Sequence, residues 1–163
     1  MITSVTCLSY EGMLERAKHY RIPANVFVVS IVDPEEAPIF AADTDRIITL
    51  RFHDLDPEWP VDPERDPRPS YVFMNEDHAR RIVDHVLRFH QHPESWACLV
   101  NCMAGVSRSG AVGTFVQRVA GIPAEQFLTQ NTGLRPNPYV HKLLMRQLTW
   151  RRRRGWSRRM SRA

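Results

Sequence analysis

The chain has 163 residues, of which 43% are hydrophobic and 25% are charged, so it is long enough for one globular domain with a buried core. It has no apolar run long enough to cross a bilayer and no basic-then-apolar signal segment, so we expect a cytoplasmic protein without a transmembrane segment. Its three widely spaced cysteines argue against a disulfide framework or a zinc site.

The formal charge of +4 comes from one end of the chain. Seven of the 22 Lys and Arg residues lie in 151–162, and all 18 acidic residues come before them. We therefore predict a globular domain over 1–150 and an arginine-rich tail over 151–163. Such a tail is either a solvated extension of the last helix or an arm that binds phosphate, on RNA or on an anionic membrane surface.

The first third of the chain predicts three strands and one helix. The strand segments alternate in polarity or are continuously apolar and rich in β-branched residues. A helix is expected over 10–20, capped by the side chain of Ser9. The strands are predicted over residues 2–7, 26–32 and 46–52.

The rest of the chain alternates helices with one more strand, after a long proline-rich segment that runs from His53 to about Met74. Asn75 can cap one helix and Gly121 can end another. Strands alternating with helices imply an α/β fold, a three-layer sandwich in which helices flank a mostly parallel central sheet. The strand is predicted over 96–101 and the helices over 76–91, 109–120, 123–130 and 139–150.

Four histidines belong to the helix over 76–91 or follow it. They lack metal-ligand spacing, and most of them are expected on its polar surface. They are His78, His85, His90 and His92.

The strand over 96–101 leads into the most informative stretch, Cys102-Met103-Ala104-Gly105-Val106-Ser107-Arg108-Ser109. A strand, a tight loop and a helix start turn backbone N–H groups inward, so the amides of Met103 to Arg108 are expected to hold a phosphate. A cysteine that faces this concavity is expected to be a thiolate nucleophile, and the planar fork of Arg108 matches phosphoryl oxygens. The residues predict attack of sulfur on phosphorus.

This C-x5-R-S stretch resembles the active-site signature of the cysteine-dependent protein tyrosine phosphatases, and it is most similar to the dual-specificity branch. The resemblance implies a metal-independent hydrolase of phosphorylated proteins or peptides that works through a phosphocysteine intermediate and uses no cofactor. Phosphotyrosine is the expected substrate, with phosphoserine and phosphothreonine as a wider range. The resemblance also implies that Ser109 hydrogen-bonds the sulfur and eases its departure. Asn101 stands where the family usually has a histidine.

The leaving group of a phosphoester needs a proton, so a general acid is expected on a separate loop. Asp54 directly follows the strand over 46–52, and the resemblance places the acid in the loop after the equivalent strand, so Asp54 is the predicted acid. The segment Arg135-Pro136-Asn137-Pro138 resembles the one that closes dual-specificity domains, in which Asn137 either braces the acid loop or forms a plain turn. The alternative acids are Asp56, Asp62 and Asp66.

Two other functions remain open. The first is an RNA 5′-phosphatase whose arginine-rich tail holds the RNA strand. The second is a phosphate-binding module without catalytic activity. The sequence does not indicate the physiological substrate or the oligomeric state.

Overall fold

A parallel sheet forms the centre of the computed structural model, which describes residues 1–57 and 71–160, with side chains as far as residue 154. In these residues the sheet has four strands in the order β1-β4-β2-β3, and every neighbouring pair is parallel. The predicted α/β class is confirmed. The strands are β1 (Ile2–Leu8), β2 (Val26–Val32), β3 (Ile47–Arg51) and β4 (Trp96–Asn101).

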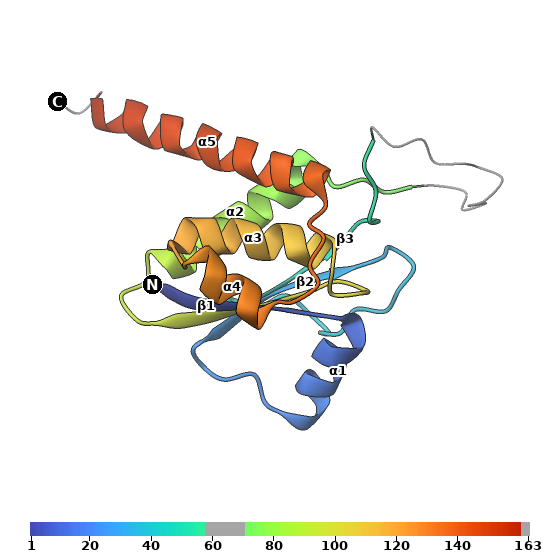
Figure 1. Ribbon diagram of the computed structural model, residues 1–163. Helices are drawn as coiled ribbons and strands as arrows, with labels where there is room; N and C mark the ends of the chain where they lie inside the picture. Colours follow the sequence, from blue (N-terminus) through green and yellow to red (C-terminus); the bar gives the residue numbers. More distant parts are fainter. Residues whose placement is uncertain (58–70, 161–163) are drawn as a thin grey trace.

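Helices cover both faces of this sheet (Figure 1). One face packs against α1, and the other packs against α2, α3 and α5. The resulting three layers agree with the predicted sandwich. The helices are α1 (Tyr10–His19), α2 (Glu76–His90), α3 (Arg108–Ala120), α4 (Ala124–Gln130) and α5 (Pro138–Met160).

Burial explains why the central strands form where the sequence predicts them. All seven residues of β2 are buried, as a continuous apolar run between two helical layers requires. Phe27 and Ile31 belong to the larger core beneath α2, α3 and α5, whereas Val28 packs with Met13 of α1 on the opposite face. The sheet is therefore held by two cores, one on each side.

The last helix is longer than predicted. The sequence predicts its end at residue 150, but α5 continues to Met160. Arginine is a good helix former, and Arg151 forms an ion pair with Asp84 of α2, so nothing stops the helix at Trp150. Arg154 also lies over the Trp150 ring, 4.3 Å from its centre. The division into a domain over 1–150 and a tail over 151–163 stays a prediction.

Side chains bind backbone groups on both outer strands of the sheet. On β1, the Asn131 side chain donates to the Val5 carbonyl at 2.9 Å and accepts from the Cys7 amide at 2.6 Å, as a neighbouring strand would. On β3, the Asp43 carboxylate accepts from the Thr49 amide at 2.7 Å. The outer strands thus find hydrogen-bond partners within the chain.

Because all the strands are parallel, their carboxyl ends meet at one edge of the sheet. The segments that follow β2, β3 and β4 begin with Asp33, Phe52 and Cys102. The carboxyl ends of the strands are where sheets of this kind place ligands.

None of the helices in the described part of the chain combines the length and apolarity that crossing a membrane requires.

Candidate active site

The loop between β4 and α3, residues 102–107, is called the cysteine loop below. On one side it is held by β1 and α1. Its Met103 carbonyl accepts from the Tyr10 amide at 3.1 Å. Gly105 has a φ of +75°, and a Cβ at this position would lie 2.6 Å from the Ser9 nitrogen. Both the left-handed conformation and the close approach of backbone to backbone require glycine here.

The opposite side of this loop is held by the segment before α5. The amide of Arg135 donates to the Val106 carbonyl, and the amide of Asn137 donates to the Ser107 carbonyl, each at 3.2 Å. In a trans peptide the N–H points away from the C=O, so the amides of Ser107 and Arg108 are directed away from these partners. The N-terminus of α3 follows directly, so this geometry leaves these amides available for the phosphate that the sequence predicts here, and phosphate binding stays a prediction.

The predicted nucleophile lies at the bottom of this loop. Cys102 is 1% exposed, and its Sγ lies 3.1 Å from the Ser109 Oγ, within hydrogen-bonding distance. The structure therefore brings together the two residues that the sequence assigns to the chemistry at sulfur.

The other two cysteines have a different environment. Burial, reinforced by the neighbouring Cys102, raises the pKa of Cys7 to about 12. Burial likewise raises the pKa of the Cys98 thiol well above its usual value. Both are therefore protonated thiols near neutral pH and contribute packing.

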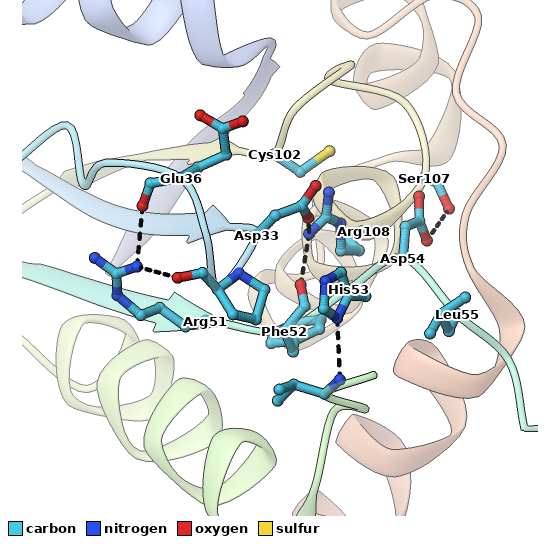
Figure 2. Close-up of polar contacts among 12 residues, drawn as sticks. Asp33, Glu36, Arg51, Phe52, His53, Asp54, Leu55, Cys102, Ser107 and Arg108 are labelled. Atoms are coloured by element: carbon cyan, nitrogen blue, oxygen red, sulfur yellow. Dashed lines mark hydrogen bonds and ion pairs between the residues drawn. The ribbon is translucent and has the colours of Figure 1, made fainter. Parts of the chain in front are cut away.

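Arg108 is buried, and one end of its guanidinium group is fixed (Figure 2). Its Nη1 donates to the Asp33 carboxylate and to the Phe52 carbonyl, both at 2.5 Å. Its buried Nε has no hydrogen-bond partner among the described residues. A guanidinium fixed in this way can offer its other N–H groups to the oxygens of a bound phosphoryl group.

Asp33 is a site residue that sequence analysis missed. It directly follows β2 and lies one strand away from the cysteine loop. The available signal was its position, because acids at the carboxyl ends of neighbouring parallel strands lie close together.

The predicted acid reaches the cysteine loop from β3. Asp54 is exposed, and one carboxylate oxygen, Oδ1, accepts from the Ser107 hydroxyl and from the Asn137 side-chain amide, each at 2.8 Å. Figure 2 shows the Asp54 and Ser107 side chains turned toward each other. Two donors on Oδ1 leave Oδ2 as the oxygen that can carry a transferable proton.

The alternative acids differ from Asp54 in their placement. Asp56 is only 8% exposed, although it lines a cavity of about 320 Å³ together with Asp54, Ser107 and Arg135. Asp62 and Asp66 lie outside the described residues. Of the acids that the structure describes in this segment, Asp54 is the one that hydrogen-bonds to the cysteine loop.

Asn137 joins the acid to α5. Its Oδ1 accepts from the Val140 amide at 3.0 Å, which fixes the side chain at the helix start, and its Nδ2 donates to Asp54. The sequence leaves two roles open for this residue, and the hydrogen bonds show that it both forms the turn and contacts Asp54, the predicted acid. Among the described residues there is no cluster of three or more His, Cys, Asp or Glu that could hold a metal ion.

The comparisons with known proteins agree with this geometry at the level of the fold. Neither family models nor curated proteins match the sequence. Among solved structures, the Cydia pomonella PTP-2 phosphatase matches with a TM-score of 0.54 and 21% identity, covering 87% of this chain and 84% of the other. Human DUSP28 matches with a TM-score of 0.54 and 19% identity, covering 92% of this chain and 94% of the other. The chain therefore has the α/β fold of the dual-specificity-phosphatase-like proteins, as its sequence predicts.

Proposed function

We propose that the protein is a cysteine-dependent phosphatase that hydrolyses phosphomonoesters of phosphorylated proteins or peptides through a phosphocysteine intermediate. Phosphotyrosine is the proposed substrate, with phosphoserine and phosphothreonine as a wider range. The observation that carries the proposal is the hydrogen bond between Asp54 and Ser107. Through it, a carboxylate from the segment after β3 contacts the loop that connects Cys102 to Arg108.

In the first step, the Cys102 thiolate attacks phosphorus and the bond to the leaving oxygen breaks. Oδ2 of Asp54 gives its proton to that oxygen, so the product leaves as a neutral alcohol or phenol. The Arg108 side chain and the amides of Met103 to Arg108 stabilise the negative charge of the phosphoryl group in the transition state.

In the second step, water attacks the phosphocysteine and the S–P bond breaks. Asp54, now a carboxylate, accepts a proton from the water. Ser109 donates a hydrogen bond to the departing sulfur, which leaves as a thiolate beside free phosphate.

The free cysteines also favour a reducing compartment, and we propose the cytoplasm.

The first experiment is hydrolysis of an aryl phosphate in EDTA by the wild type, Cys102→Ser and Asp54→Asn. We expect Cys102→Ser to show no turnover and Asp54→Asn to lose about 100-fold or more in kcat, the contribution of a general acid. Asp45→Asn, which changes an exposed aspartate that pairs with Arg88, is the matched control and should keep wild-type turnover.

Turnover by Cys102→Ser would contradict the proposed mechanism. If Cys102→Ser is inactive while Asp54→Asn matches the wild type, the nucleophile stands and Asp56 becomes the acid to test. A wild type that binds vanadate or phosphate but turns over no ester would instead be a phosphate-binding module.

An RNA 5′-phosphatase is the second candidate, because α5 extends into arginines 151–154. The helix begins next to Asn137, so Arg151 lies about 20 Å along its axis at about 1.5 Å per residue. An RNA whose 5′ end occupies the cysteine loop would therefore reach these arginines only if it is several nucleotides long.

A further inference from the structure

The residue before the proposed acid is fixed by its ring. His53 is 3% exposed, and its Nε2 lies 3.1 Å and 3.3 Å from the two carboxylate oxygens of Glu35. Its Nδ1 accepts from the Val72 amide at 3.0 Å. We propose, building on the proposed function, that His53 is a positioning residue that sets the orientation of Asp54 toward the substrate.

These contacts determine where the imidazole carries its proton. A nitrogen that accepts from an amide N–H has no proton of its own, so Nδ1 is bare and the proton is on Nε2. Nε2 then donates to the Glu35 carboxylate. The neutral ring satisfies both contacts at once, with Glu35 at one end and Val72 at the other.

A backbone hydrogen bond also joins His53 to Val72. The His53 amide donates to the Val72 carbonyl at 2.8 Å, while the Val72 amide donates to the His53 ring. This reciprocal pair ties the exit of β3 to the segment that leads into α2. Glu35 adds the loop after β2, so His53 joins three segments of the chain.

Three consecutive residues are thereby fixed by different partners. The Phe52 carbonyl accepts from Arg108, the His53 ring is bound as described, and Asp54 accepts from Ser107 and Asn137. Asp54 is exposed, and the two donors hold only its Oδ1, so the direction of the carboxylate depends also on where the backbone at His53 places it. A misplacement of about 1 Å at a reacting group can cost about 100-fold in rate.

A role in stability alone accounts poorly for the contact between His53 and Glu35. The Glu35 side chain is 52% exposed, and its hydrogen bond with a neutral ring adds little to the free energy of folding. What the contact does supply is a fixed ring orientation one residue away from the proposed acid.

The test uses two aryl phosphates that differ in the acidity of their phenol. A phenol of low pKa leaves as the phenolate without a proton, whereas a phenol of high pKa, called the basic phenol below, needs a proton from the general acid. We expect His53→Leu to lose about tenfold or more in kcat on the basic phenol and less than about twofold on the acidic one, a smaller version of the Asp54→Asn pattern.

Conservative variants separate the two ring contacts. His53→Asn can still accept from Val72, His53→Gln can still donate to Glu35, and we expect each to recover part of the lost turnover. Glu35→Gln should show a partial loss with the same preference for the acidic phenol. Glu36→Gln is the matched control, because Arg51 contacts the Glu36 backbone carbonyl and not its side chain, and it should match the wild type.

Every assay is run well below the unfolding midpoint of each variant, so that loss of fold does not enter the rates. Equal losses on both phenols, or no loss in His53→Leu, would overturn the positioning role while leaving the phosphatase mechanism intact. A wild type that cleaves neither aryl phosphate would instead refute the proposed function itself.

Discussion

At the scale of single residues, the site depends on contacts between segments that are far apart in the sequence. The Cys102–Arg108 spacing and Ser109 could be predicted because they lie within one short stretch. Asp33 could be placed near the site from its position after β2, but its pairing with Arg108 could not be predicted, because the two residues are 75 positions apart in the sequence. Asp54 is predicted from its position after a strand together with the family resemblance, but its contact with Ser107 follows only from the way the sheet is assembled.

Gly105 carries a prediction at this scale. A methyl group at Gly105 would meet the backbone of Leu8 and Ser9 at 3.0 Å or less, in a conformation that disfavours any side chain. We expect Gly105→Ala to destabilise the fold by about 1–3 kcal/mol and to lower kcat/KM at least about tenfold, since the loop must move away from β1. Urea denaturation and aryl phosphate kinetics measure the two effects.

Gly121→Ala is the control for this change. Gly121 shares the positive φ, at 69°, but nothing lies within 4 Å of its would-be Cβ. It should lose about 1 kcal/mol of stability and keep its kcat/KM. Wild-type kinetics in Gly105→Ala would show that the loop tolerates the displacement.

At the scale of elements, apolar patterns predicted the strands well and the helix ends less well. β2 and β4 match their predicted bounds because turn residues flank both apolar runs. The sequence predicts the end of the last helix at residue 150 and leaves its extension open as one of two alternatives for 151–163, because a run of arginines contains no signal that ends a helix. It also placed most histidines of α2 on the surface, whereas His85 is 7% exposed. His85 stands three residues after Ile82 and four before Phe89, so the helical spacing already contained that signal.

The buried face of α2 gives a prediction about pH. His85 packs edge-on against Phe27 and Phe89, with ring centres 5.5 Å and 5.1 Å away. Burial, only partly opposed by the backbone of Arg46, lowers the pKa of His85 from 6.5 to about 4. The unfolded chain therefore takes up a proton at a pH where the folded chain does not, so folding stability is present above pH 6.5 and falls as the pH drops toward 4.

The expected loss is about 3 kcal/mol over that interval, at about 1.4 kcal/mol per pKa unit. Urea denaturation at a series of pH values measures it. His85→Phe should remove this part of the dependence, whereas His92→Phe, which changes a partly exposed histidine, should retain it. Identical slopes for His85→Phe and the wild type would contradict the assignment.

At the scale of the whole molecule, the loop of Cys102 and the arginines 151–154 lie at different ends of α5. The helix starts beside Asn137 and runs away from the carboxyl ends of the strands (Figure 1). The proposed chemistry and the proposed RNA contact can therefore be separated by shortening the chain.

We expect a chain that ends at Trp150 to keep wild-type turnover of an aryl phosphate. If RNA is the substrate, the same chain should lose affinity for a long 5′-phosphorylated RNA but not for a dinucleotide, and the salt dependence of binding should fall as phosphate contacts are lost. Fluorescence anisotropy at two salt concentrations measures this. Equal affinity of both chains for the long RNA would remove the tail from the proposal.

The side-chain contacts on the outer strands of the sheet have a consequence for self-association. An open edge strand is a template on which another chain can add a strand, and such growth leads to edge-to-edge dimers and fibrils. Here Asn131 and Asp43 already occupy backbone groups of β1 and β3 that an incoming strand would need. At these positions an added strand would have to displace Asn131 or Asp43, so the described part of the sheet disfavours association through its outer strands.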